Sequence, residues 1–198
     1  MRAFSVCLGT VALVVAGLGV GPASGAESDH GYSALIRRAS YGVPHITARD
    51  FGSLGFGVGH VQAEDNLCVI AEKVVTVSAE RSRWFGAGAG DANVRSDLFY
   101  RKAIDDRVAE RLLDGRRDGV HAPSDDVREQ IRGFVAGYNH HLRRTGVPNL
   151  SDPACRGKPW VRPLTEMDVW RASWASMVRA GSRALLDGII AAAPPAAA

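Results

Sequence analysis

Residues 55–67 read Gly-Phe-Gly-Val-Gly-His-Val-Gln-Ala-Glu-Asp-Asn-Leu, inside a stretch, 50–83, whose pattern is mostly helical. Gly55, Gly57 and Gly59 stand at alternate positions, but this spacing is not the dinucleotide-binding fingerprint and follows no clear parallel strand. A glycine inside a helix costs about 0.5–1 kcal/mol relative to alanine. We therefore expect a helix here that packs closely against another element.

Short strands are expected before this helix. Residues 32–39 and 43–47 have strand character, and Pro44 suits an edge position because it cannot donate a backbone hydrogen bond. Two strands this short cannot stand alone and need a larger sheet to join. The sequence therefore favours an α-rich α+β fold whose sheet is completed from elsewhere.

Three further helices are expected after it. The first covers 97–114, and the second begins at the cap Ser124 and carries a regular apolar stripe. The third begins at Thr165, which forms a capping-box pattern with Asp168. A further turn or two is expected over 185–190.

Composition narrows the class of protein. The chain has 198 residues, of which 46% are hydrophobic and 23% charged, so it is neither disordered nor collagen-like. Basic residues number 24 and acidic residues 21. A net charge of +3 that is spread along the chain does not indicate a basic nucleic-acid-binding surface, and no nucleic-acid partner is expected.

Both ends of the chain differ from its middle. Residues 1–26 combine a positive start, an uncharged apolar run and a small-residue end at Ala26, a pattern typical of a secretory signal peptide. The alternative is an N-terminal membrane anchor. Residues 191–198 contain only Ala and Pro and are interpreted as linker. We expect a secreted protein, with no membrane association after signal cleavage, whose folded part is 27–190.

Export changes the interpretation of the cysteines. Cys7 would leave with the signal peptide, and Cys68 and Cys155 remain. In an oxidising compartment they are expected to form one disulfide, which would contribute about 4 kcal/mol in the chain-entropy model. The alternative is two buried, unpaired thiols.

Several common catalytic motifs are absent from the sequence. There is no Gly-x-Ser-x-Gly elbow and no His-Glu-x-x-His zinc motif. His60 and Glu64 are one helical turn apart, but two ligands do not make a metal site, so they are interpreted as a polar helix face. His140 and His141 are adjacent and would not share a helix face. We expect no metal site and no complete catalytic constellation.

Five segments of the sequence match motifs of one known protein family and follow one another in the same order as in that family. They are Ile36–Ala48, Gly55–Leu67, Glu80–Gly86, Phe134-x-x-Gly137-Tyr138-Asn139 and Trp160–Thr165. Together they resemble the penicillin acylase family, and within it the secreted acylases of cyclic lipopeptides, penicillin V and acyl-homoserine lactones. One such segment alone would be weak evidence, but five in order over residues 32–190 are specific.

This resemblance implies that the chain is the α-subunit portion of a four-layer αββα sandwich of the N-terminal nucleophile hydrolases. A β subunit from the same precursor would complete the sheet. That subunit would also begin with the Ser nucleophile, whose own amino group serves as the base. The implied reaction hydrolyses the amide bond that joins an acyl chain to an antibiotic, a lipopeptide or a homoserine lactone. No catalytic residue and no cofactor is expected in this chain.

The resemblance also implies that the helix near the C-terminal end of the chain lines an acyl pocket. The matching residues are Trp174, Ser176, Met177, Arg179 and Ala180. Small side chains at two of these positions would leave room for a long acyl chain, while Trp174 and Met177 could instead be ordinary core residues. In the penicillin G acylases that this chain resembles, a glutamate on this stretch helps to bind calcium. No glutamate follows Met167 here, so calcium binding through this chain is not expected.

A function of another class stays open at this point. The chain could be a secreted, non-catalytic helical binding module or an inactive truncated acylase, because it contains no nucleophile of its own. The codons that follow Ala198 distinguish these alternatives from an acylase precursor.

Overall fold

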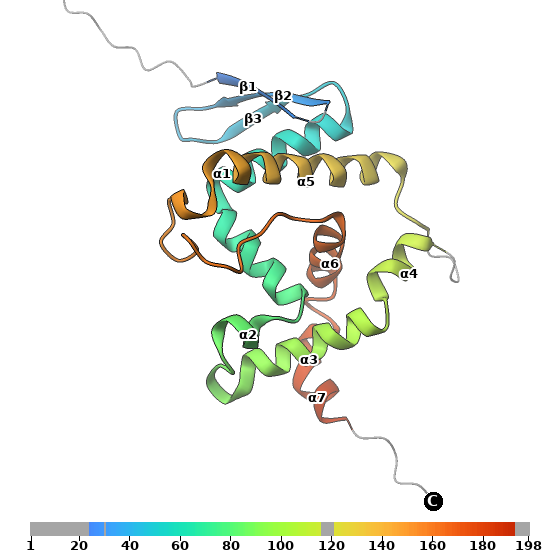
Figure 1. Cartoon of the computed structure of the whole chain (residues 1–198). Coiled ribbons are helices and arrows are strands. Elements are labelled where there is room, and N and C mark those ends of the chain that lie inside the picture. The colour runs from blue at the N-terminus through green and yellow to red at the C-terminus, as the bar shows by residue number, and fades with distance from the viewer. Residues whose placement is uncertain (1–23, 30, 116–120, 193–198) are drawn as a thin grey trace, which may run out of the picture.

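The computed structural model describes residues 24–29, 31–115 and 121–192. Most of the expected signal peptide, 1–26, and most of the expected linker, 191–198, lie outside the described residues. In Figure 1 a small sheet lies above two crossing helices, α1 and α5, and the other helices lie below them.

The sheet has three antiparallel strands in the order β1-β2-β3. They are β1 (Ser24–Asp29), β2 (Tyr32–Arg38) and β3 (Pro44–Thr47). The two expected strands are confirmed, with Pro44 on an edge strand. β1 was not expected, because its residues were interpreted as the end of the signal peptide and the start of the mature chain. Ala34 and Ile36 of β2 are buried, which gives the sheet one apolar face.

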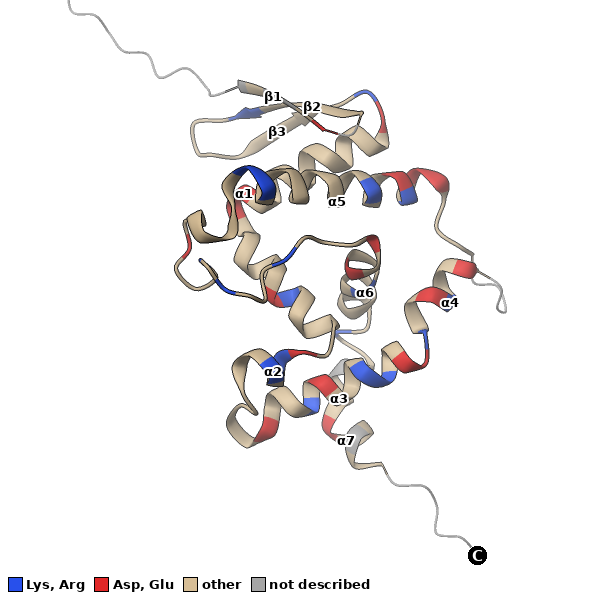
Figure 2. Cartoon of the chain, viewed as in Figure 1, with Lys and Arg blue, Asp and Glu red and all other residues tan. Residues whose placement is uncertain are grey.

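The described residues form seven α-helices: α1 (Phe51–Val77), α2 (Arg81–Phe85), α3 (Ala92–Asp105), α4 (Val108–Asp114), α5 (Asp125–Thr145), α6 (Glu166–Met177) and α7 (Leu186–Ala191). Ser124 caps α5 as expected, accepting a hydrogen bond from the backbone of Val127 at 3.4 Å. Acidic side chains occupy the first turn of α5 and arginines its last, which complements the helix dipole (Figure 2). None of the helices within the described ranges is both long and apolar enough to cross a membrane.

The backbones of α1 and α5 are in direct contact where the helices cross, and glycines make this possible. A Cβ atom added to Gly55 or Gly59 would lie 2.1 Å from a carbonyl oxygen of α5. A Cβ atom added to Gly133 or Gly137 would lie 1.9 or 2.0 Å from a carbonyl oxygen of α1. Gly57, on the opposite side of α1, faces the sheet instead. The expected close packing of this helix is confirmed.

α1 bends at Asn66, whose φ of −140° and ψ of 26° are not helical. Before the bend the helix packs against the sheet and α5, and most of its residues in the main core lie after the bend. That core consists of Ala63, Leu67, Ala71, Val74, Tyr138, Leu142, Leu150, Cys155, Val161 and Leu164. A second, smaller cluster contains Val77, Phe99, Tyr100 and Ala175, where the end of α1 meets α3 and α6.

A disulfide joins α1 to the loop that follows α5. It links Cys68 to Cys155, which are 87 residues apart in sequence and 5.5 Å apart between Cα atoms. Cys155 is fully buried in the main core. The expected bond is confirmed, and the alternative of two unpaired thiols is wrong.

Two expected helices are interrupted. The helix expected over 97–114 is two helices, α3 and α4, separated at Arg107, whose φ of 53° is left-handed. The break turns α4 toward α6, where Glu110 accepts a hydrogen bond from Arg171 at 3.2 Å. The stretch 50–83 is likewise divided after Val77, because Ala79 has a φ of 57°. Apolar periodicity alone does not detect such turns, because it continues through them.

Tyr138 has an unusual position in the main core. Its side chain is fully buried, burial raises its pKa, and its hydroxyl has no hydrogen-bond partner among the described residues. We expect Tyr138→Phe to raise the free energy of unfolding by about 1 kcal/mol, because the change removes a buried polar group without leaving a cavity. Urea denaturation measures this difference, and Tyr32→Phe, which removes a hydroxyl that donates to Glu129 at 2.6 Å, is the matched control expected to destabilise. A loss of stability in Tyr138→Phe would show that the hydroxyl is bonded.

Candidate functional site

An ion pair between the partly exposed Arg162 and the buried Asp168 fixes the start of α6. Arg162 donates one hydrogen bond of 2.7 Å to each carboxylate oxygen of Asp168, and Thr165 donates to Oδ2 through its backbone and its hydroxyl, both at 2.8 Å. Asp168 is 3% exposed. Burial opposes its charge, but the hydrogen bonds from Arg162 and Thr165 outweigh burial and lower its pKa. The predicted capping box is confirmed, and Arg162 completes it.

The five residues expected to line an acyl pocket lie at the C-terminal end of α6 and in the turn after it. Trp174 is partly buried and stacks on an aromatic ring of α3, with 5.9 Å between ring centroids. Ser176 and Met177 are exposed in the last turn of α6, Met177 at 71%. Arg179 and Ala180 follow in an exposed turn. Met177 is therefore not a core residue of the described chain, whereas Trp174 packs at the edge of the second cluster.

Two mostly apolar grooves flank this end of α6. One, with a volume of about 390 Å³, lies between α3, α6 and α7 and is lined by Leu98, Phe99, Ala103, Val108, Trp174 and Ile189, among others. The other, with a volume of about 360 Å³, lies between α1, α5 and α6 and is lined by Val69, Ile70, Phe134, Val169, Ala172 and Ser176, among others. Trp174 and Ser176 thus line different grooves. Their assignment to one acyl pocket stays a prediction.

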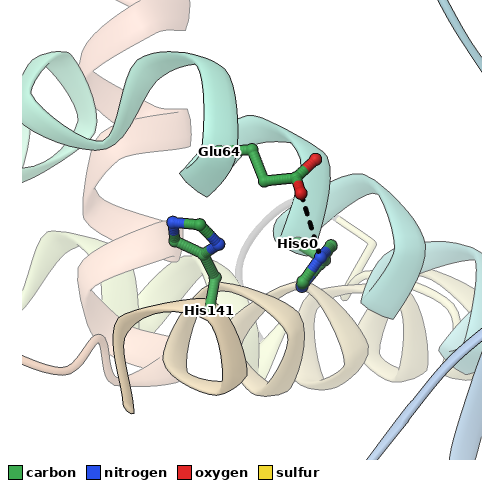
Figure 3. Close-up of side chains that lie close together, drawn as sticks. All are labelled: His60, Glu64 and His141. Atoms are coloured by element: carbon green, nitrogen blue, oxygen red, sulfur yellow. Dashed lines mark ion pairs between the residues drawn. The ribbon is translucent and has the colours of Figure 1, made fainter. Parts of the chain in front are cut away.

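A group of histidines gathers where α1 and α5 cross. His60 of α1 is 4% exposed, and its ring centroid lies 5.5 Å from those of both His140 and His141 on α5. Glu64 lies one turn after His60, with 3.5 Å between Nε2 and Oε1 (Figure 3). The interpretation of His60 and Glu64 as a polar helix face is therefore wrong for His60, because α5 covers it. His140 and His141 are adjacent, but both reach the ring of His60.

Burial also affects the protonation of this group. It lowers the pKa of His141, and the neighbouring His60 lowers it further. The His141 ring is therefore neutral near neutral pH, and a neutral imidazole can accept a hydrogen bond or bind a metal ion.

Two sets of hydrogen bonds between a side chain and a distant backbone segment, called clamps below, involve residues of the five family segments. The side chain of Asn139 pairs with both backbone groups of Leu164, at 2.9 and 2.8 Å. Asp97 accepts hydrogen bonds from the backbone of Arg81 and Ser82, at 2.8 and 2.7 Å, and so caps the start of α2. Sequence reasoning missed both clamps, because the partners are distant in sequence and belong to different elements.

The comparisons with known proteins agree with this pattern. Residues 33–185 match the penicillin amidase family. The chain is 76% identical over 178 residues to the aculeacin-A acylase of Actinoplanes utahensis, a match that covers 89% of this chain and 22% of that protein. It is 37% identical over 168 residues to the acyl-homoserine lactone acylase PvdQ of Pseudomonas fluorescens, which covers 83% of this chain and 20% of that protein.

The fold also resembles a solved structure. A chain of the thermostable penicillin G acylase of Alcaligenes faecalis superposes with a TM-score of 0.61 at 24% sequence identity, covering 89% of this chain and 96% of that chain. The present chain spans about a fifth of the length of the curated relatives that it matches. The family pattern expected from the five segments is confirmed, and the chain belongs to the penicillin amidase family.

Proposed function

We propose that this chain is the α-subunit part of a secreted amidohydrolase that removes acyl chains from lipopeptides or acyl-homoserine lactones. The observation that carries the proposal is the 76% identity to aculeacin-A acylase over 89% of this chain. At this identity the core, the clamps and the α6 region are expected to be shared. The names of the other relatives, acyl-homoserine lactone acylases, point to the same reaction class.

The lengths of the matching chains support an enzyme of two chains. The match covers about a fifth of each curated acylase, but 96% of the matching chain in the penicillin G acylase structure. This is the relation expected of a precursor that is processed into a short α subunit and a longer β subunit. The nucleophile, a Ser at the start of the β subunit, and the residues that stabilise the oxyanion would then lie outside the present chain.

The arrangement of the sheet supports the proposal that a partner subunit completes it. β1 and β3 are its edge strands, and α1 covers one face, where Ala34 and Ile36 are buried. On the other face of β2, Ser33 and Arg37 are exposed. A β subunit that extends this sheet and packs a second sheet against it would give the four-layer αββα sandwich.

Export is part of the proposal. The signal peptide would end at Ala26, which lies within β1, so cleavage there would leave Glu27–Asp29 to pair with β2. Arg143 of α5 forms an ion pair with Asp29, and Nδ1 of His140 lies 3.4 Å from the same carboxylate, so these contacts would keep the new N-terminus attached. The disulfide between Cys68 and Cys155 fits an oxidising compartment.

The experiment is to express the complete reading frame and examine the secreted product. Intact mass should show two chains, the first of them beginning near Glu27. Release of free amine should follow incubation with an acylated cyclic lipopeptide, with N-acyl-homoserine lactones of several chain lengths, or with penicillin V. A Ser→Ala change at the first residue of the second chain is the inactive control. A processed two-chain protein that leaves every one of these amides intact would overturn the proposal, as would a single stable chain.

The acyl-pocket assignment predicts a change in substrate preference. Ser176→Phe fills the groove between α1, α5 and α6, so kcat/KM for long acyl chains should fall at least about tenfold relative to short ones. The ratio of kcat/KM values across a series of acyl-homoserine lactones measures the effect. Ser40→Phe, in the exposed turn before β3, is the control and should leave the ratio unchanged. An unchanged ratio in Ser176→Phe would remove this residue from the pocket.

A further inference from the structure

Three side chains with metal-binding atoms meet at the crossing of α1 and α5. They are His60 and Glu64 of α1 and His141 of α5, and their ligand atoms all lie within 4.8 Å of one another. Figure 3 shows the Glu64 carboxylate above His60 and the His141 ring turned toward both. The side chain of His60 is 5% exposed and that of Glu64 is 38% exposed, so the group is buried on one side and open to solvent on the other.

We propose that His60, Glu64 and His141 bind a zinc ion. Two imidazole nitrogens and one carboxylate oxygen are a donor set that zinc prefers, with an open fourth position for water. Bonds of about 2.0–2.1 Å in a tetrahedron put neighbouring ligand atoms roughly 3.4 Å apart. His60 Nε2 and Glu64 Oε1 are already 3.5 Å apart. The remaining separations are at most 4.8 Å, and because Glu64 is exposed and His141 is only partly buried, both side chains have room to rotate toward a shared ion.

Two of the three ligands also have hydrogen-bond partners outside the cluster. Arg38 donates a hydrogen bond of 2.7 Å to Glu64 Oε2, which leaves Oε1 directed at His60. The hydroxyl of Thr145 lies 3.3 Å from Nε2 of His141, which leaves Nδ1 as the metal-binding nitrogen. Hydrogen bonds of this kind orient ligating carboxylates and imidazoles. The cluster is therefore a site with both ligands and supports, and not merely three polar side chains in proximity.

A zinc ion at this site would join α1 to α5 close to the bend in α1. Its ligands come from α1, just before the bend at Asn66, and from the last two turns of α5. Because the ligands converge only in the folded chain, zinc would stabilise the folded state and raise its melting temperature. This consequence is independent of amide hydrolysis, so it can be tested whether or not the protein is an acylase.

The experiment uses protein expressed from its complete reading frame, stripped with a chelator, exposed to zinc sulfate and dialysed. Elemental analysis should find about one zinc ion per chain in the wild type, and zinc should raise the melting temperature. His141→Ala and Glu64→Gln should retain no zinc and show no shift. His121→Ala, which removes an exposed histidine before α5, is the matched control and should behave as the wild type.

A further variant separates zinc binding from folding. Thr145→Val keeps all three ligands but removes the hydroxyl beside His141, and should weaken zinc binding roughly ten- to a hundredfold. Circular dichroism of the metal-free proteins establishes which variants are folded. If His141→Ala is unfolded, Glu64→Gln and Thr145→Val decide the outcome. Wild-type protein that retains no more zinc than folded Glu64→Gln would overturn the proposal.

Discussion

Gly59→Ala is expected to destabilise the folded protein by about 3 kcal/mol or more. The added Cβ atom would lie 2.1 Å from the carbonyl oxygen of Phe134, a distance that no real Cβ contact allows. The obstacle is backbone of α5, which cannot rotate away as a side chain can. The two helices must therefore separate, and separation exposes the apolar side chains packed between them.

Thermal and urea unfolding of the purified variant measure this loss. Gly188→Ala in α7 is the matched control, because nothing lies within 4 Å of a Cβ atom added there. Alanine is a better helix former than glycine, so this control should be neutral or slightly stabilising. Gly57→Ala should fall between the two, since its added Cβ meets the side chains of Ile46 and Ala34, and Ile46 can move. Equal stability of Gly59→Ala and Gly188→Ala would contradict the backbone contact between α1 and α5.

The glycines show how much of the fold can be predicted from the sequence. Glycines within a helical pattern have few explanations, so close packing could be predicted for α1. The partner helix was not identified, although a signal was present: Gly133 and Gly137 of α5 have the same four-residue spacing as Gly55 and Gly59. The strand β1 was missed for another reason. Its small residues were interpreted as a signal-peptide end, and the strand becomes evident only from its pairing with β2, which no local pattern in β1 indicates.

The candidate site shows where sequence reasoning ends. His60 and Glu64 could be placed on one helix from their spacing, but the third side chain, His141, is supplied by another helix about eighty residues later. The pairing of Asn139 with Leu164 likewise depends on two elements meeting. The capping box at Thr165, the cap Ser124 and the cysteine pair were predicted correctly, because the first two depend on local hydrogen bonds and two cysteines allow only one pairing. Convergence of distant side chains has no such local signal.

Arg162→Met is expected to lower the free energy of unfolding at pH 7 by about 2 kcal/mol, less than for a fully buried pair because the Arg162 side chain is 40% exposed. Methionine replaces the aliphatic part of the arginine side chain but has no guanidinium, so both hydrogen bonds to Asp168, whose side chain is 5% exposed, are lost. A buried carboxylate then remains without its cation, and this costs more than an ion pair contributes. Lys102→Met is the matched control, because Lys102 and Asp106 form a pair at the surface, which should contribute little.

The pH dependence of this loss identifies its cause. In the wild type the pKa of folded Asp168 is lowered, so its contribution to stability is present above the unfolded value of about 3.9 and is lost as the pH falls through the folded pKa. In Arg162→Met only burial and the Thr165 hydrogen bonds remain, and burial favours the neutral acid. The carboxyl of the variant should therefore take up a proton at higher pH than in the wild type. Protonation removes the free-energy cost of keeping an unpaired charge buried. The stability difference should shrink as the pH falls from 7 toward 4 and below, as measured by urea denaturation at several pH values. A difference that is constant over this range would mean that lost packing, and not an unpaired charge, destabilises the variant.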